Sequence, residues 1–345
     1  MFYYCPKCKQ TWQYPIEKCP ECFSQLKRED SQVLKVIGVS KTNIPTILHP
    51  KVPYFILLLE DEKSRKFVQK SEKEYKIGDE FKIKAAKNKS TVAVWRIKYD
   101  LEDALEKLLG LVGEIKINPE TKVLILPTLI SPKHPYLREN TSPEFLKEVI
   151  SYFFRKGVRP ENVKVAGQSF DEIPIEGSVQ KSGLLPVFQE LKIAPFNLAQ
   201  GNFVKKDKFE VSEELFKNDL IINLPIMKAD ADLKVKGALF NLLKLLKKEN
   251  YLSLKYLSSD EEIIQEFKKI IPEILTIAES YKVQRKDGIS TFLGIHLAGF
   301  NPLNLDRVFA EIIMSELPDY LKSVRIEEIE IVGRQIKEVQ QPLQE

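Results

Sequence analysis

From about residue 100 onward, short apolar runs alternate with amphipathic segments. Three runs, Val123–Pro127, Val163–Gly167 and Leu220–Pro225, have the length and apolar character of buried strands. Thr141–Glu144 combines a hydroxyl cap, a first-turn proline and an early acid, which predicts the start of a helix. This alternation predicts an α/β domain with a mainly parallel sheet over residues 100–333.

The same pattern predicts the other elements of this domain. They are helices at Asp103–Leu111 and Leu303–Glu316, a long amphipathic helix at Asp260–Tyr281 interrupted or capped near Pro272, a strand-like run at Ile289–Leu297, and alternation over Arg325–Val332. Residues 334–345 are a polar tail that we expect to be loose.

Before residue 100 the rhythm is that of short strands separated by turns. The β-rich runs are Val33–Val39, Tyr54–Leu59, Lys66–Gln69, Glu80–Ala85 and Thr91–Lys98. Five short strands after a metal-binding N-terminus predict a small barrel of the OB type over residues 31–99.

Four cysteines, the only ones in the chain, form two Cys-x-x-Cys pairs within residues 1–30. They are Cys5, Cys8, Cys19 and Cys22. Two such pairs can close a tetrahedral site around one ion, which predicts a rubredoxin-like zinc ribbon with a structural Zn²⁺. Iron accepts the same ligands and stays an alternative. A redox dithiol pair or a secreted disulfide framework is disfavoured, because the sequence shows no secretory leader and is rich in lysine.

Composition and charge narrow the function classes. The chain has 345 residues, enough for two or three domains. No apolar run is long enough for a bilayer, so we expect a cytoplasmic protein that does not span a membrane. Lysine and glutamate are abundant and cysteine and methionine scarce, a thermophile-like balance. Residues 1–100 hold 20 basic and 12 acidic side chains, which suits an anionic partner such as nucleic acid, a nucleotide or coenzyme A. A solvated lysine surface explains the same excess equally well.

Polar loops follow the three apolar strands. In open α/β sheets ligands bind beyond the carboxyl ends of strands, so neighbouring strands would bring these loops to one crevice that could hold an anion or a metal. Polar strand-to-helix loops are also common without a ligand. The candidate residues are Thr128 and His134 after the first strand, Gly167, Gln168 and Ser169 after the second, and Lys228 and Asp230 after the third.

No familiar catalytic motif appears in the sequence: it has no G-x-G-x-x-G, no Walker-type loop, no G-x-S-x-G and no H-E-x-x-H. His134 is the best histidine for a ligand or base, whereas His296 lies in an apolar run that favours a core position. Asn241 interrupts an apolar helix and therefore needs hydrogen-bond partners, from the protein or from a ligand. Asp306 fits an early-turn helix acid slightly better than a ligand contact.

Residues 1–99 resemble the acyl-CoA-associated zinc-ribbon/OB-fold family, domain of unknown function 35. The resemblance rests on Tyr4–Cys8, Cys19–Cys22, Gly38–Thr42, Val52–Tyr54 and Ile77–Glu80. It implies a module that accompanies thiolase-like condensing enzymes, which archaeal members bridge into complexes.

Residues 120–320 resemble the domain-of-unknown-function 362 family. The matching segments are Pro127–Leu129, Thr141–Pro143, Val163–Ser169, Leu224–Lys228, Lys236–Asn241 and Asp287–Asp306. Family members often have a histidine where this chain has Asp230, and many carry ferredoxin-type cysteines that are missing here. The resemblance therefore implies a fold and a site location more than a reaction.

Three hypotheses follow from these patterns. In the first, an acyl-CoA-associated accessory protein docks a condensing enzyme or a CoA thioester, and its α/β domain binds an anionic metabolite. In the second, the α/β domain is an enzyme of unknown reaction in which Lys228 or His134 provides acid–base chemistry and Asp230 and Asp306 orient groups or bind a divalent metal. In the third, the barrel binds single-stranded nucleic acid, with bases stacked on strand aromatics such as Tyr54, Phe55, Phe81 and Trp95. We favour the first; the sequence leaves open whether the protein is an enzyme.

Overall fold

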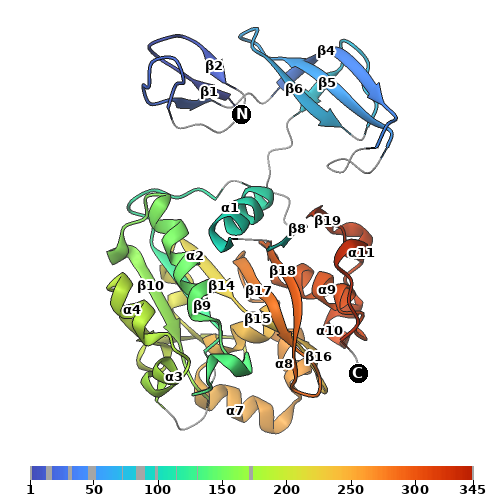
Figure 1. Ribbon diagram of the computed structural model, residues 1–345. Helices are drawn as coiled ribbons and strands as arrows, with labels where there is room; N and C mark the ends of the chain where they lie inside the picture. The colour runs from blue at the N-terminus through green and yellow to red at the C-terminus, as the bar shows by residue number, and fades with distance from the viewer. Residues whose placement is uncertain are drawn as a thin grey trace. The chain divides into compact units, whose positions relative to one another are not determined.

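The computed structural model describes residues 2–12, 18–29, 33–45, 52–71, 73–82, 90–97, 100–113, 115–129, 131–170 and 174–343. The chain divides into two compact units, Met1–Ala85 and Ala86–Glu345, each of which is described by itself (Figure 1). In the described residues no helix combines the length and the apolar character needed to cross a membrane.

The first unit is built from two small antiparallel sheets. One has the order β2-β1-β3 and contains β1 (Phe2–Tyr4), β2 (Thr11–Trp12) and β3 (Lys27–Glu29). The other has the order β6-β5-β4-β7 and contains β4 (Val33–Thr42), β5 (Tyr54–Glu60), β6 (Lys66–Ser71) and β7 (Glu80–Lys82).

Alternation along β5 gives the second of these sheets its core. Phe55, Leu57 and Leu59 point to one side and are buried, together with Leu34 and Val36 of β4. Because side chains alternate across a strand, the residues between them face the other side of the sheet.

The second unit is a three-layer α/β domain around a mixed, mostly parallel sheet with the order β11-β10-β9-β14-β17-β18-β8-β19. β15 and β16 extend this sheet beside β17. A separate pair, β12 and β13, is antiparallel. The strands are β8 (Thr91–Arg96), β9 (Val123–Pro127), β10 (Val163–Gly167), β11 (Pro195–Asn197), β12 (Phe203–Lys206), β13 (Phe209–Ser212), β14 (Leu220–Leu224), β15 (Ile226–Asp230), β16 (Lys234–Lys236), β17 (Leu275–Gln284), β18 (Ser290–Gly299) and β19 (Glu330–Gly333).

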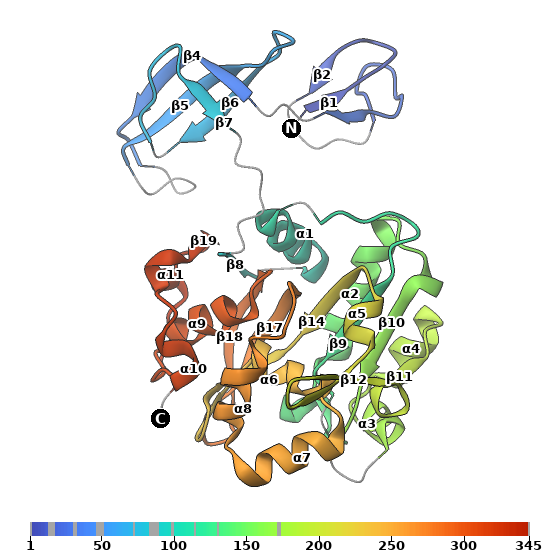
Figure 2. The same ribbon diagram turned by 180° about the vertical axis from the view of Figure 1, so that it is seen from behind.

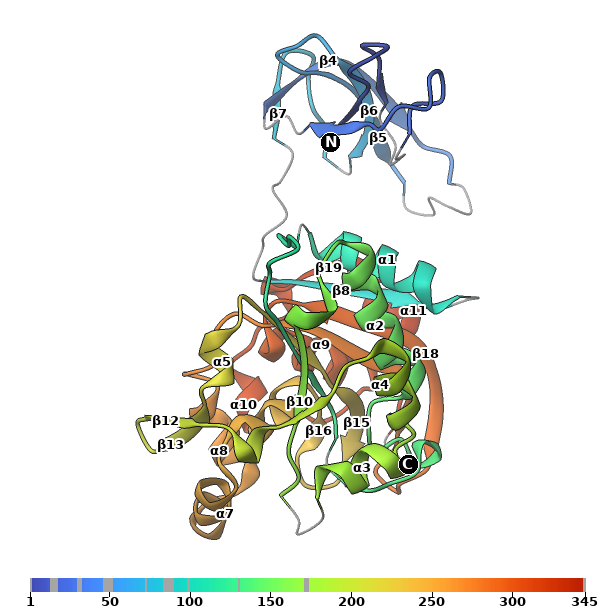
Figure 3. The same ribbon diagram turned by 90° about the vertical axis from the view of Figure 1, so that its left-hand side faces the viewer.

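Helices cover both faces of this sheet, and a hydrophobic core lies on each (Figures 1, 2 and 3). The helices are α1 (Leu101–Val112), α2 (Pro143–Arg155), α3 (Ile175–Lys181), α4 (Leu185–Leu191), α5 (Glu214–Lys217), α6 (Ala238–Leu242), α7 (Lys248–Leu257), α8 (Asp260–Phe267), α9 (Pro302–Ile312), α10 (Asp319–Lys322) and α11 (Ile336–Val339). One core gathers α1, α2 and α4, and the other gathers α6, α8, α9 and α10.

The predicted start of the helix after β9 is confirmed. The Ser142 side chain accepts a hydrogen bond from the Phe145 amide at 3.4 Å, and Pro143 occupies the first turn, where its missing N–H costs nothing. The apolar stripe of this helix, which includes Val149 and Phe153, packs into the core.

Three sequence predictions differ from the structure. The strand at Thr91–Lys98, assigned to the barrel, lies as β8 in the sheet of the second unit, between β18 and β19. Its side chains are buried on both faces, so alternation alone could not identify its sheet. The expected helix Asp260–Tyr281 ends at Phe267, and its second half is β17, because Pro272 stops the helix and the run that follows it is a buried strand.

The expected loose tail is also folded where it is described. It forms α11, and Leu343 is buried against the core of the second unit. The Arg96 guanidinium donates to the backbone oxygen of Glu338 at 2.6 Å, which fastens this segment to β8.

Candidate functional site

The four cysteines lie together, as their spacing predicted. Their Sγ atoms all lie within 4.8 Å of one another, and Cys5 and Cys19 are fully buried. Each pair sits on a loop of the same shape. The amide four residues after the first cysteine donates to that cysteine's oxygen, from Lys9 to Cys5 and from Phe23 to Cys19, both at 2.8 Å.

The donor set fits a metal ion. The Cys8 amide donates to the Cys5 sulfur at 3.3 Å, as amides do around thiolate ligands, and the Cys22 sulfur lies 3.2 Å from the Ser24 hydroxyl. The neighbouring sulfurs, Cys22 foremost, and burial raise the pKa of Cys8 to about 12. The Ser24 hydroxyl and amide, in contrast, lower the pKa of Cys22 to about 6. Four sulfurs this close together can be ligands of one cation, so the four Cys side chains could bind a metal together.

At the carboxyl end of the second unit's sheet, Lys228 of β15 is the most buried charged residue among those predicted there. It is 7% exposed, and its ammonium donates to Glu139 at 2.6 Å. Gln284, which is opposite Lys228 in the register of β17, donates to the other carboxylate oxygen of Glu139 at 3.3 Å. Burial opposes the charged form of Glu139, but Lys228, Gln284 and Lys133 outweigh it and lower the carboxyl pKa.

A second ion pair comes from the same loop. The Arg138 guanidinium lies 3.2 Å from the Glu279 carboxylate, which also accepts the Ser142 amide at 2.8 Å. Burial raises the pKa of Glu279, although the Ser142 and Arg138 contacts oppose that rise. Glu139 and Glu279 therefore place two carboxylates beside two cations at this edge of the sheet.

Asp230 ends β15 and holds a turn. One carboxylate oxygen accepts the amides of Asp232 at 3.1 Å and Leu233 at 2.9 Å, and the other lies 2.7 Å from the Lys236 ammonium. Burial opposes its charge, but Lys236 and the two amides lower its pKa. Asp230 thus shapes the turn between β15 and β16.

Thr128 and Asn241 lie in a buried hydrogen-bond network that joins α6 to β9 and β14. The Thr128 hydroxyl donates to Asn241 at 2.9 Å and accepts the Ile226 amide at 3.0 Å. Asn241 in turn donates to the Leu126 oxygen at 3.0 Å and to Asn223 at 2.7 Å. The hydrogen-bonding groups of the Asn241 side chain therefore find their partners within the protein, one of the two alternatives that the sequence left open.

Gln168 follows β10 and binds the backbone of the segment after α6. Its amide donates to the backbone oxygens of Lys244 and Leu246. Lys244 turns its side chain into the same layer, where the amine donates to the Pro127 oxygen. Burial lowers the pKa of Lys244 to about 7.

Asp306 of α9 caps the short helix α6. Its carboxylate accepts the Ala238 amide at 2.6 Å and the Leu239 amide at 2.9 Å. Burial raises its pKa to about 7, against the effect of these amides. A Cβ at Gly237 would lie 2.2 Å from the Asp306 oxygen, so only glycine fits this close approach.

The remaining predicted residues serve the backbone or the core. His134 is exposed, and its Nδ1 accepts the Tyr136 amide at 3.2 Å, which caps a short 3₁₀ turn. His296 is buried in β18 against Phe145, with ring centroids 4.6 Å apart, and burial lowers its pKa to about 3. Gly167 is buried at the end of β10, and Ser169, half-buried, follows Gln168.

The predicted site residues therefore fall into two groups. Lys228 and Asp230 are charged positions on β15, whereas Thr128, Gln168, Asn241 and Asp306 hold the elements beneath them. Sequence reasoning missed Glu139 and Lys244. Lys244 has a signal, since it stands alone among four leucines in Leu242–Leu246; Glu139 lies in a polar loop where nothing distinguishes it.

Comparisons with known proteins identify one family model. The model described as "Domain of unknown function (DUF362)" matches residues 123–311, which includes β9, β15, β17 and most of α9. No curated protein matches the sequence.

Three solved structures are similar at low identity. The "Ltp2-ChsH2(DUF35) aldolase" is 18% identical, with a TM-score of 0.19, and the match covers 29% of this chain and 75% of that one. A protein from Thermotoga maritima is 14% identical, with a TM-score of 0.34 and coverage of 53% and 50%. The lactate racemase apoprotein from Thermoanaerobacterium thermosaccharolyticum is 13% identical, with a TM-score of 0.39 and coverage of 66% and 57%. The match spans half the length of the Thermotoga maritima protein and 57% of the racemase apoprotein.

Proposed function

The chain belongs to the DUF362 family, and from that premise we propose that it is an acyl-CoA-associated accessory protein. Its N-terminal unit would hold a structural zinc ion in a ribbon and dock a thiolase-like, CoA-using enzyme or the CoA moiety itself through an OB-type barrel. Its α/β domain would bind an anionic metabolite at the carboxyl end of the sheet, near Lys228.

The observation that carries this proposal is the outward face of the four-stranded sheet. Ile56, Leu58 and Val68 are 38%, 37% and 51% exposed, and Leu58 and Val68 are directly paired between β5 and β6. Lys66 and Lys70 alternate with Val68 along β6 and share this outward face. We call Ile56, Leu58 and Val68 the apolar strip.

An apolar strip between lysines suits a partner that offers both apolar and anionic groups. A protein surface with an acidic rim has this character, and so does coenzyme A, whose phosphates follow an uncharged pantetheine arm. The resemblance of residues 1–99 to the zinc-ribbon/OB-fold family supports the same partner class.

Zinc is the ion that best suits the four-cysteine cluster in this proposal. A closed set of four thiolates satisfies its tetrahedral preference and leaves no open position, so the ion would stabilise the fold and take no part in a reaction. Iron would be held by the same four ligands.

An anion near Lys228 would have to share the ammonium with Glu139, since the pair is already closed at 2.6 Å. Three ammonium donors permit this, because the structure shows one of them in use by Glu139. Arg138, which precedes Glu139 in sequence and pairs with Glu279 of β17, would supply a second cation.

The test is binding of acetyl-CoA by calorimetry and capture of a CoA-using enzyme, identified by mass spectrometry, on the immobilised full-length protein. Leu58→Lys should weaken capture at least tenfold, because it places a charge in the centre of the strip. Ile77→Lys, at an exposed apolar residue outside the strip, is the matched control. If the wild type neither binds acetyl-CoA nor captures a CoA-using enzyme, the proposal is wrong.

A second candidate function is an enzyme centred on the α/β domain. The close Lys228–Glu139 pair favours it, since a buried lysine and a carboxylate at hydrogen-bond distance can exchange a proton with a bound substrate. Once a turnover is detected, Lys228→Ala and Asp230→Ala variants that fold and retain it would count against this function.

Nucleic-acid binding by the barrel has less support. Two of the aromatic side chains expected to stack on bases, Tyr54 and Phe55, are 7% and 6% exposed, and Trp95 belongs to β8 of the second unit. Tight RNA binding that weakens steeply with added salt would restore this reading.

A further inference from the structure

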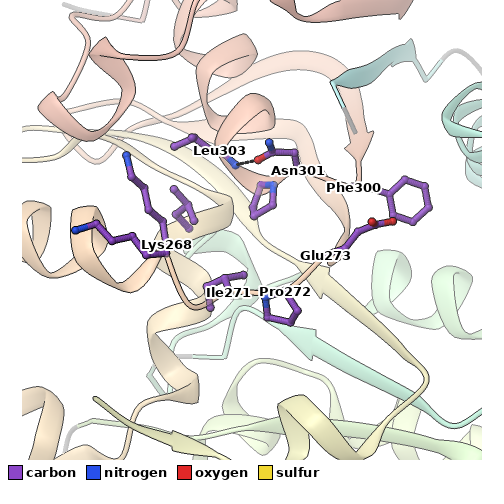
Figure 4. Close-up of a pocket in the computed structure, with 10 residues that line it drawn as sticks. Lys268, Ile271, Pro272, Glu273, Phe300, Asn301 and Leu303 are labelled. Carbon is purple, nitrogen blue, oxygen red and sulfur yellow. Dashed lines mark hydrogen bonds between the residues drawn. The ribbon is translucent and has the colours of Figure 1, made fainter. Parts of the chain in front are cut away.

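A separate cavity lies at the opposite end of the sheet from Lys228. It has a volume of about 400 Å³ and is bounded by the segment between α8 and β17 and by the start of α9 (Figure 4). This segment leads into the amino end of β17, whereas Lys228 pairs with Gln284 at the carboxyl end of the same strand. The cavity is therefore distinct from the carboxyl-edge cluster, and its size lies within the range of small-molecule sites.

The middle of the cavity is apolar. Its lining includes Leu239 of α6, Ile271 and Pro272 of the connecting segment, and Phe300 and Leu303 at the end of β18 and the start of α9. Leu239 and Phe300 are 2% and 9% exposed, so they belong to the packed core and give the cavity a fixed wall. Such a surface binds an aromatic or branched hydrocarbon group.

One end of the cavity is basic. Lys268 and Lys269 both line it. Lys268 is half-buried, its ammonium donates to the backbone oxygen of Tyr320 at 3.2 Å, and it makes no ion pair with a carboxylate in the described part of the chain. Burial, and next the charge of Lys269, lower its pKa. A half-buried ammonium beside a second ammonium is stabilised by an anion.

At this basic end the exposed Lys269 lies 3.7 Å from the Glu266 carboxylate, whereas Lys268 has no such partner among the described residues. The acid that lines the cavity, Glu273, lies away from this end. In Figure 4, Glu273 lies beside Phe300, whereas Lys268 lies on the other side of the apolar residues. The amino end of α9 offers no further donor, because Asn301 already accepts the Leu303 amide at 3.0 Å.

We propose that this cavity is a binding site for a small organic carboxylate with an apolar body. The carboxylate would bind Lys268 and Lys269 at the basic end, and the hydrocarbon part would lie against Leu239, Phe300 and Leu303. The ligand would be monoanionic, since one anion compensates the unpaired charge of Lys268.

The experiment uses 4-fluorophenylacetate and its neutral amide as probes of the full-length protein, with binding measured by ¹⁹F NMR. The acid should bind about tenfold more tightly than the amide, because a charge-assisted hydrogen bond is worth about that factor. Lys268→Met should bring the affinity for the acid down to that for the amide while leaving the amide unchanged. Lys322→Met, at an exposed lysine on nearby α10, should change neither.

A cavity-filling variant locates the binding. Leu303→Trp should abolish binding of both probes, and a thermal unfolding midpoint close to that of the wild type shows that the fold is intact. Equal affinity for the acid and the amide, or acid binding that survives Leu303→Trp in the folded protein, would overturn the proposal. Absence of acid binding to the wild type at millimolar concentrations would overturn it equally.

Discussion

Lys244 makes the stability of the α/β domain depend on pH in a calculable way. It is 5% exposed, its amine donates to the Pro127 oxygen, and it makes no ion pair with a described carboxylate. Burial lowers its pKa from 10.5 to about 7. At roughly 1.4 kcal/mol for each pH unit, this difference amounts to about 5 kcal/mol of unfolding free energy.

Because the pKa of Lys244 is lower in the folded state than in the unfolded state, the stability of the domain rises with pH. A lysine depressed in the folded state contributes stability that is fully present above pH 10.5, and this contribution is lost as pH falls towards 7. Lys244→Met removes both the titration and one hydrogen bond, which costs about 1 kcal/mol at every pH. We therefore expect the variant to be less stable than the wild type near pH 10 and more stable near pH 7.

The assay is urea unfolding at several values between pH 7 and 10. Trp95 of β8 reports on the α/β domain, and a Trp12→Phe background removes the signal of the other unit. Lys322→Met, at an exposed lysine, should follow the wild type at every pH. If the difference between wild type and Lys244→Met is the same at pH 7 and pH 10, Lys244 stays charged in the folded protein and the reasoning is wrong.

The other predictions concern the cysteine cluster and the cap of α6. Chelation of the bound metal or Cys19→Ser should unfold the cluster loops, measured as loss of metal content and of amide-exchange protection; protection that survives would show that the metal is not structural. In the wild type, the raised pKa of Asp306 stabilises the folded state at low pH, and about 4 kcal/mol of unfolding free energy is lost as pH rises from 4 to 7. Asp306→Asn should remove this pH dependence, measured by urea unfolding. Gly237→Ala should cost about 3 kcal/mol in urea unfolding, since its Cβ would displace the Asp306 oxygen that is held by the Ala238 amide. Gly110→Ala in α1 meets no atom within 4 Å and should not destabilise, so equal effects of the two variants would contradict the close approach.

The sequence predicted those elements whose signals are local. β9 is a continuous apolar run, and β10 and β14 are apolar runs with one polar residue each, Lys164 and Asn223. α2 begins at the Ser-Pro pair that its cap requires. β17 was missed because Leu275–Tyr281 has helix-compatible spacing and lies just after a true helix. Only its partners β14 and β18 decide that it is a strand.

For the site, the sequence could indicate polar residues but not their partners. The four cysteines were predictable because their ligand spacing is itself the signal. Lys228 was found as a charged residue after a strand, but its pairing with Glu139 depends on a loop 89 residues away in sequence. Asn241 and Asp306 looked like possible ligand contacts, and their roles in holding α6 follow only from the folded positions of Thr128 and Ala238.

The position of β8 has a consequence for synthesis. β8 is the first strand of the α/β domain to leave the ribosome, yet both of its neighbours, β18 and β19, come from the end of the chain. The Thr91 hydroxyl of β8 donates to the carboxylate of Glu330, the first residue of β19, across 239 residues of sequence. At usual rates of translation this is a wait of roughly 10 to 50 s, during which an apolar strand has two open edges. The nascent domain should therefore need a chaperone until its last strands emerge, and chains cut short before β18 should aggregate.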